Sequence, residues 1–233
     1  MVANSAFDVL PRIWRFLDID GYRVHSDQAF GMYKPFDLDR QPPAPDGLTG
    51  RFEWLSQCSA PEEWAITQDD DGDHTRVQRP EALAEIAGSR EVDPAFRFFI
   101  EHPELQRKVR SVSGCYLDLA DVGVSIGDAD GLLCHFLSDQ QWVRHWLVWC
   151  GPGPRQGSVV TTSKPYGFGS EDWHEPEPAS ISNIGATDLE VCADSFEEFL
   201  FRFWVENELW HKDPSEPGHL SSYAKALKHQ NSS

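Results

Sequence analysis

Residues 132–149, LLCHFLSDQQWVRHWLVW, decide the fold of this 233-residue chain. Two apolar runs, Leu132–Leu137 and Trp142–Trp149, are separated by the short polar link SDQQ. Runs of this length, rich in branched and aromatic residues, predict strands, and two strands joined by so short a link pair as an antiparallel hairpin. Both faces of Trp142–Trp149 are largely apolar, so we expect a central strand that is covered on both sides.

The hairpin link also predicts which residues face each other. A two-residue turn and a four-residue turn give the same register. The predicted pairs are Leu137 opposite Trp142, His135 opposite Arg144, and Cys134 opposite His145.

Further strands and helices flank this hairpin. The strands are predicted at Ser113–Leu119 and Ser158–Ser163. Asp93 followed by Pro94 is typical of a helix start, and the apolar spacing after it predicts a helix. Two other helical segments are predicted at Glu81–Ala87, which Gly88 would end, and at Glu104–Val109.

The clearest helix is predicted at Ser195–Trp210. Ser195 and Glu198 have the spacing of a capping box. The apolar residues after them repeat at helical spacing and form one buried stripe: Phe196, Phe199, Leu200, Phe203 and Trp204. Helices, then an antiparallel sheet, then a packing helix predict an α+β domain.

The chain is predicted to consist of three segments. Residues 1–79 are expected to form a partly helical N-terminal extension, with a helix around Val9–Leu17 and a proline-rich break at 41–47. Residues 80–212 are expected to form the α+β domain, and residues 213–233 a polar tail that frays. The predicted fold is therefore a single α+β domain with a mainly antiparallel sheet packed by helices, plus an N-terminal helical extension.

The charge of the chain is strongly negative and unevenly distributed. The formal net charge is −18. Residues 62–104 carry a net charge of −8, and residues 171–216 carry a net charge of −11. These two segments therefore account for the whole excess of negative charge. A negative field of this size repels phosphate backbones, which argues against nucleic-acid binding and favours a basic protein partner.

The cysteines and the N-terminus bear on the cellular compartment. The five cysteines are odd in number, widely spaced and without a CxxC pair, which argues against a disulfide framework and a structural zinc site. The N-terminus lacks the basic and apolar regions of a signal peptide, and no apolar run approaches the length of a membrane span. We expect a cytoplasmic protein that makes no membrane contact.

Four runs within residues 80–205 resemble the SUKH superfamily of bacterial immunity proteins, which also includes a fungal regulator of cell-wall synthesis. These runs are PAFRFFIEHPELQRKVRSVSGCYLDL, LLCHFLSDQQWVRHWLVWCG, GSVVTTS and ADSFEEFLFRFWVE. The resemblance implies a single α+β domain without chemistry of its own. Bacterial members bind and neutralise a cognate toxin, often a nuclease, whereas fungal relatives are regulatory binding proteins. The matched positions are structural: Gly114, Trp146 and the stripe of Phe196, Phe199 and Leu200.

Two groups of ionisable residues in the hairpin are candidates for chemistry. His135, Arg144 and Asp139 form either an acid/base or anion-binding cluster or a polar pair beside an exposed turn. Cys134 opposite His145 is either a thiolate–imidazole dyad or a pair of metal ligands, or else a buried core pair. We favour the structural interpretation of both groups, because no further catalytic residue has a fixed relation to them.

The acidic run at residues 69–73 does not match a calcium loop. Placing Gly72 at the glycine position puts Thr67 at the first position and Gln78 at the twelfth, where acidic residues are required. We therefore predict no catalytic residues, no cofactor and no metal.

The remaining candidate site is a binding surface. Trp173 lies in a polar loop among acidic residues, a setting that is typical of an interface anchor. The predicted partner-binding residues are Asp69, Asp70, Asp71, Asp73, Glu171, Asp172, Trp173 and Glu175. The predicted function is an immunity protein that neutralises a basic, nuclease-type toxin. The alternatives are a regulatory scaffold for endogenous proteins and a hydrolase using Cys134 and His145.

Overall fold

The computed structural model describes residues 6–16, 33–69, 72–73, 75–88, 90–127, 129–168, 180–211 and 219–230. Its main element is a seven-stranded sheet with the order β8-β4-β5-β6-β7-β9, in which β3 also pairs with β5. These strands are β3 (Tyr116–Leu117), β4 (Val124–Ile126), β5 (Leu132–Ser138), β6 (His145–Cys150), β7 (Val159–Thr162), β8 (Ser180–Ile181) and β9 (Glu190–Ala193). All pairings are antiparallel except β4 with β8, which confirms the predicted mainly antiparallel sheet.

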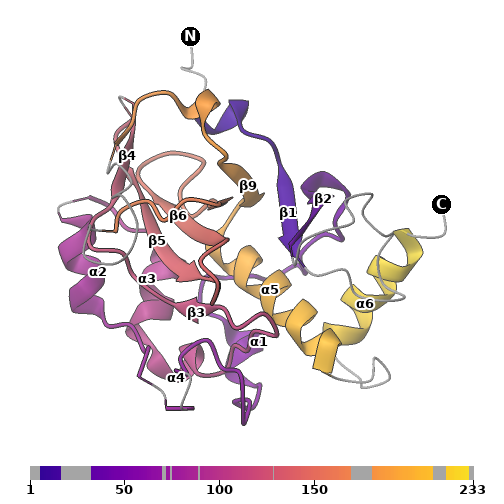
Figure 1. The fold of residues 1–233 in the computed structure, drawn as a ribbon. Coiled ribbons are helices and arrows are strands. Elements are labelled where there is room, and N and C mark those ends of the chain that lie inside the picture. The colour runs from indigo at the N-terminus through magenta and orange to yellow at the C-terminus, as the bar shows by residue number, and fades with distance from the viewer. Residues whose placement is uncertain are drawn as a thin grey trace.

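The remaining elements surround this sheet (Figure 1). A separate two-stranded antiparallel sheet pairs β1 (Ile13–Phe16) with β2 (Lys34–Asp37). The α-helices are α1 (Glu53–Ser56), α2 (Pro80–Ala87), α3 (Pro94–Glu101), α4 (Pro103–Gln106), α5 (Phe196–His211) and α6 (His219–Gln230). Short 3-10 helices are η1 (Ala6–Val9), η2 (Leu38–Arg40) and η3 (Ile184–Ala186). Within the described residues, none of the helices combines the length and the apolar character needed to span a bilayer.

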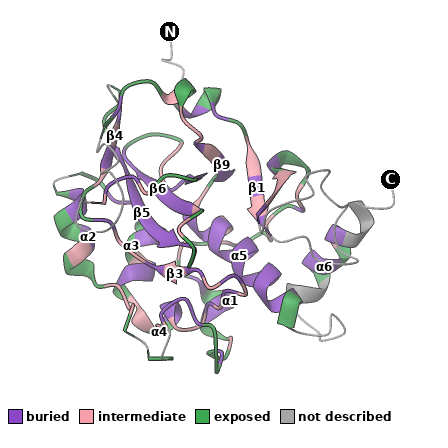
Figure 2. Ribbon diagram, viewed as in Figure 1, coloured by how far each residue is buried: buried purple, intermediate pink, exposed green. Residues whose placement is uncertain are grey.

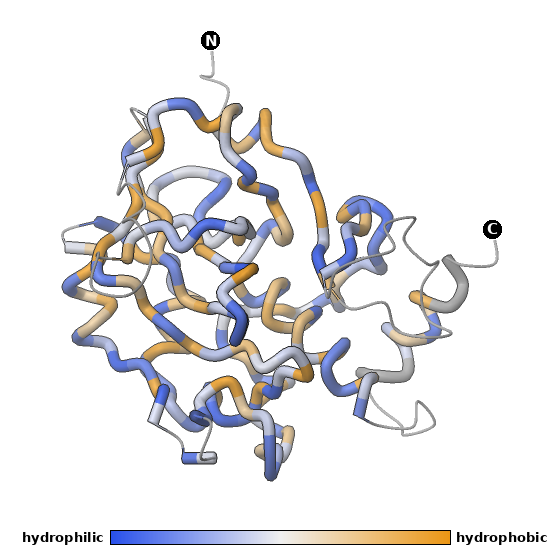
Figure 3. Tube along the Cα trace, viewed as in Figure 1, coloured by the Kyte–Doolittle hydropathy of each residue, from blue (hydrophilic) through white to orange (hydrophobic). Residues whose placement is uncertain are grey.

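The helices predicted after residue 80 are present as α2, α3, α4 and α5, although α4 ends at Gln106 instead of Val109. Helix α5 forms the centre of the fold. Phe196, Phe199 and Phe203 pack on the aromatic side chains of the sheet, including Trp146 and Phe136. Each buried ring contributes on the order of 1.5–3 kcal/mol. In Figure 2, α5 is buried along most of its length, and in Figure 3 hydrophobic and hydrophilic residues alternate along the chain.

The opposite side of α5 is covered as well. Buried polar side chains on α5 hold other segments: Asn207 accepts the backbone N–H of Val112 at 2.7 Å. Arg202 donates to the carbonyl of Pro42, also at 2.7 Å. This helix therefore connects the sheet to the N-terminal part of the chain.

The expected helix around Val9–Leu17 is wrong, because residues 13–16 form strand β1. Pro11 cannot donate a helical hydrogen bond, and burial alternates along the strand, with Trp14 and Phe16 inside. The described part of the first 79 residues thus contains an antiparallel strand pair, β1 and β2, together with the short helical segments η1, η2 and α1. A single hydrophobic core runs from Phe7 to Leu227 and draws on all three predicted segments.

The expected frayed tail after residue 213 is also wrong for residues 219–230, which form α6. Tyr223, Ala224 and Leu227 are buried in the core, and the ring of Tyr223 meets Phe201 of α5 edge-on. Three apolar side chains on one face are enough to place an otherwise polar helix.

The hairpin is confirmed, but its predicted register is wrong. Leu137 pairs with Trp146, His135 with Leu147 and Cys134 with Val148. The strand after the turn starts at His145 rather than Trp142, and the register shifts between His135 and Leu137. This shift is a β-bulge, in which one extra residue of β5 is accommodated. The predicted strand Ser113–Leu119 is likewise reduced to β3, Tyr116–Leu117.

Candidate functional site

Only two of the eight predicted partner-binding residues are described. Asp69 accepts the backbone N–H of Asp73 at 2.9 Å and the hydroxyl of Thr75 at 3.0 Å. Its carboxylate therefore closes a turn, whereas Asp73 is exposed. The other six lie outside the described residues: Asp70, Asp71, Glu171, Asp172, Trp173 and Glu175.

A pocket of about 610 Å³ opens beside this turn. Three carboxylates line it, from Glu62, Glu63 and Asp69. The other lining residues are Trp64, Ala65, Gln68, Gly72, Arg76, Gly114, Cys115, Tyr116 and Gln140. The acidic segment 62–104 thus contributes one wall of a concave surface.

Trp64 at the rim of this pocket is 51% exposed, although its backbone is strained. Its φ of 68° lies in the left-handed region, which bulky residues rarely adopt. The backbone on both sides is fixed, because Ser111 donates to the Trp64 carbonyl at 2.8 Å and Ile66 donates to the Val109 carbonyl at 2.8 Å. The fold therefore holds the indole outside the core at a cost in backbone energy.

The inner wall of the pocket is a stack of aromatic and charged groups. The Arg76 guanidinium lies 3.8 Å from the ring centre of Tyr116, whose hydroxyl accepts the indole N–H of Trp142. Burial raises the pKa of the nearby Asp118 to about 6, and the charge of Arg76 opposes this shift. Burial also raises the pKa of Tyr116.

Beneath the pocket, Cys115 belongs to a buried polar network. The hydroxyl of Tyr33 lies 3.0 Å from Ser113 Oγ, 3.3 Å from Cys115 Sγ and 3.2 Å from Asp139 Oδ2. Burial raises the pKa of the Cys115 thiol to about 11, so this sulfur is protonated at neutral pH and a poor nucleophile.

The predicted pair of Cys134 and His145 does not form. His145 pairs with Ser138, and Cys134 pairs with Val148. Paired residues share a face of the sheet and neighbours in a strand alternate, so the thiol and the imidazole lie on opposite faces. The second predicted cluster is also separated, because His135 pairs with Leu147 instead of Arg144. Asp139 accepts backbone N–H groups from Gln141 and Val143 and shapes the turn.

A different group, His135, Ser138 and His145, does come together, and all three residues are fully buried. The Ser138 hydroxyl lies 3.1 Å from His135 Nε2 and 3.0 Å from His145 Nδ1. Burial lowers the pKa of His135 to about 3 and of His145 to about 4. Sequence spacing alone did not indicate this group, because the bulge brings it together.

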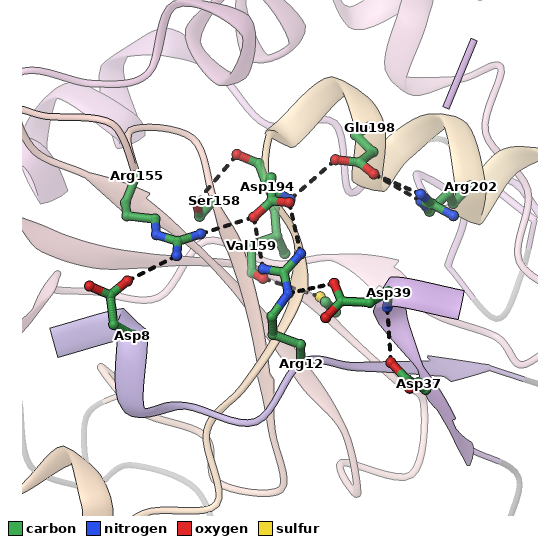
Figure 4. Close-up of polar contacts among 11 residues, drawn as sticks. Asp8, Arg12, Asp37, Asp39, Arg155, Ser158, Val159, Asp194, Glu198 and Arg202 are labelled. Atoms are coloured by element: carbon green, nitrogen blue, oxygen red, sulfur yellow. Dashed lines mark hydrogen bonds and ion pairs between the residues drawn. The ribbon is translucent and has the colours of Figure 1, made fainter. Parts of the chain in front are cut away.

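A charged network joins the N-terminal segment to Arg155 and to Asp194, which precedes α5 (Figure 4). Arg12 donates to both oxygens of Asp194, at 2.9 and 2.8 Å, and to Asp39 at 2.8 Å. Arg155 bridges Asp194 and Asp8 at 3.0 and 2.9 Å. Every member has its partner within the network, so we assign it to the attachment of the N-terminal segment.

Among the described residues, no three histidine, cysteine, aspartate or glutamate side chains form a metal-binding group. Comparison of the chain with family models, curated proteins and solved structures finds no match. The pocket at Trp64 is therefore the candidate functional site on its geometry alone.

Proposed function

We propose that the protein is a non-enzymatic immunity protein that binds and neutralises a basic, nuclease-type toxin in the cytoplasm. The observation that carries the proposal is Trp64, a half-exposed tryptophan held in a strained conformation beside three carboxylates at a pocket of about 610 Å³. Trp is the residue type most enriched in binding hot spots.

The charge of the pocket selects the partner. Glu62 and Glu63 are exposed next to Trp64, in a chain whose net charge is −18. A cationic surface is attracted to this rim, and such attraction raises the association rate. A basic side chain of the partner can lie against the indole face while it pairs with a carboxylate.

A binding role fits the chemistry of the buried groups better than catalysis does. The thiol of Cys115 has a raised pKa, and Cys134 and His145 lie on opposite faces of the sheet. The hydrolase alternative based on that pair is therefore not proposed. The resemblance to the SUKH superfamily supports the immunity role over the regulatory scaffold.

The test begins with capture of the partner by the full chain, followed by washes at low and high salt. We expect one stoichiometric basic protein, released by salt, whose toxicity this chain suppresses when both are expressed together. Several endogenous proteins without toxicity would instead support the scaffold. Retention of no protein would contradict both binding roles.

Variants then locate the binding surface. Trp64→Ala should weaken the complex by about 2 kcal/mol, roughly 30-fold in Kd. Trp210→Ala is the matched control, since Trp210 is 54% exposed at the end of α5, away from the pocket lining. If Trp64→Ala and Trp210→Ala weakened the complex equally, the binding surface would not lie at the Trp64 pocket.

Charge variants test whether the carboxylates at the pocket attract the partner and raise the association rate. Glu62→Gln with Glu63→Gln should lower the association rate and its salt dependence. Glu81→Gln with Glu85→Gln removes the same charge from exposed positions of α2 and should have a smaller effect. An association rate that is unchanged between about 50 and 500 mM salt would contradict the electrostatic part of the proposal.

A further inference from the structure

The inner wall of the Trp64 pocket carries a positive charge, in contrast with its acidic rim. The half-buried Arg76 lines the pocket, and its guanidinium lies flat on Tyr116, 3.8 Å from the ring centre. The hydroxyl of Tyr116 in turn accepts the indole N–H of Trp142. The three side chains come from segments far apart in the sequence, so the tertiary fold sets the orientation of the guanidinium.

No carboxylate of the described residues forms an ion pair with Arg76. Asp69 lines the same pocket, but its oxygens accept from the backbone of Asp73 and from Thr75. Asp118 lies beyond ion-pair distance, and burial raises its pKa to about 6 against the opposing charge of Arg76. Stacking occupies a face of the guanidinium, so N–H donors at its edge remain for an acceptor.

A partner that covers the pocket would make this positive charge costly. Contact at Trp64 removes water from the inner wall, and a desolvated charge without a counter-charge is strongly unfavourable. A uniformly basic surface would also place like charge against Arg76. The acidic rim therefore attracts a basic partner, whereas the inner wall disfavours any partner that brings no acceptor to Arg76.

We propose that the protein partner inserts one aspartate or glutamate side chain onto Arg76, flanked by basic residues that pair with Glu62 and Glu63. This inference rests on the proposed function, because it takes the Trp64 pocket as the binding surface. Arginine binds a carboxylate through two parallel hydrogen bonds, which fixes the position of the inserted side chain. The volume of about 610 Å³ lies within the usual range of ligand pockets.

A second donor in the pocket lining suits the same carboxylate. Gln140 is exposed in the turn between β5 and β6 and lies against Gly114. Its amide oxygen is so close that a Cβ on Gly114 would come within 2.6 Å of it. The amide group of Gln140 can donate to an inserted carboxylate beside Arg76.

The direct test compares two capped peptides, acetyl-Gly-Lys-Asp-Lys-Gly-amide and the same peptide with asparagine in place of aspartate. Each is titrated into the full wild-type chain, with NMR detection of the Trp64 indole N–H and the Arg76 Nε–H. We expect the aspartate peptide to bind about fivefold more tightly. General attraction to a chain of net charge −18 predicts the reverse, because the asparagine peptide is more positive. Equal affinities, tighter binding of the asparagine peptide or no shift with either would overturn the proposal.

Variants assign the preference to Arg76. Arg76→Gln should abolish the preference for aspartate, and Arg76→Lys should retain part of it, because the charge stays and the planar fork is lost. Arg79→Gln is the matched control, since Arg79 is exposed and outside the pocket lining. Equal losses in Arg76→Gln and Arg79→Gln would overturn the assignment. If Arg76→Gln does not fold, the two peptides on the wild-type chain still decide the question.

The peptide test needs no toxin, so its outcome is independent of the proposed function. A preference for aspartate without capture of a toxin would support the recognition chemistry and contradict the immunity role. In a captured complex, Arg76→Gln should weaken binding about tenfold. A complex that depends on Trp64 but is unchanged in Arg76→Gln would keep the immunity role and overturn the inserted carboxylate.

Discussion

Glu197 is the buried carboxylate through which α5 holds residues 50–54, and its removal should be severely destabilising. Its oxygens accept the backbone N–H groups of Gly50 and Phe52 and the indole N–H of Trp54, the last two at 3.0 Å. Only 2% of Glu197 is exposed. Glu197→Ala would leave three donors without an acceptor.

The expected loss follows from that count. A buried polar group without a partner costs about 1–3 kcal/mol, so the loss of one acceptor for three donors in Glu197→Ala should lower the free energy of unfolding by about 3–9 kcal/mol. Glu197→Gln should cost less, about 1–3 kcal/mol, because the amide oxygen still accepts two of the bonds. Glu53→Gln is the control: Glu53 is exposed on the same segment and should change stability by less than about 0.5 kcal/mol.

The contribution of Glu197 to folding stability should change with pH in a definite direction. Burial raises the pKa of Glu197, and the three hydrogen bonds oppose the shift. A pKa raised in the folded state adds stability below the unfolded pKa, and this contribution is lost as pH rises through the folded pKa. The stability difference between wild type and Glu197→Gln should therefore be larger at pH 4 than at pH 7.

Urea unfolding followed by tryptophan fluorescence measures both effects. A loss below about 1 kcal/mol for Glu197→Ala, with an unchanged slope against urea, would refute the reasoning. It would mean that water reaches the three donors or that residues 50–54 rearrange without penalty.

Three further changes test other parts of the structure. Asp194→Asn should lower the free energy of unfolding by about 1 kcal/mol, because the ion pair between Asp194 and Arg12 is partly exposed to solvent. The Arg12 guanidinium holds the pKa of Asp194 below its usual range. The wild-type contribution should therefore be present above about pH 4 and lost as pH falls, a trend that urea titrations of the variant should lack. Gly114→Ala should destabilise by about 1–2 kcal/mol in the same assay, because φ is 66° and a Cβ would lie 2.6 Å from Gln140 Oε1. Gly47→Ala, also at positive φ but in open space, should cost less. Leu227→Ala should cost about 2–3 kcal/mol in calorimetry; a loss near zero would mean that α6 does not contribute to the core.

Local patterns were sufficient for much of the chain after residue 80. The hairpin, the Asp93 cap of α3 and the aromatic stripe of α5 depend on neighbours a few residues apart, so spacing predicts them. The two predictions that were wrong, the helix around Val9–Leu17 and the frayed C-terminal tail, also have local causes. Pro11 and a two-residue alternation in β1 outweighed an apparent helix, and three apolar residues placed α6 against the core.

The candidate site was only partly predictable. The acidic segment 62–104 was identified, and Asp69 does line the pocket. Trp64 was missed as an anchor, although a tryptophan directly after two glutamates is a signal of the kind that singled out Trp173. Its exposure depends on backbone bonds to residues 109 and 111, which are more than forty positions away.

The sequence by itself determined the α+β class, the antiparallel hairpin and the helix that packs on it, because apolar periodicity and caps act over a few residues. Tertiary structure alone decided which ionisable groups meet. The longer turn, after which β6 starts at His145, moved Cys134 away from His145, and the bulge in β5 put His135 on the face that carries Ser138 and His145. A shift of one residue moves side chains to the other face of a strand, and no pattern within β5 announces where that shift occurs.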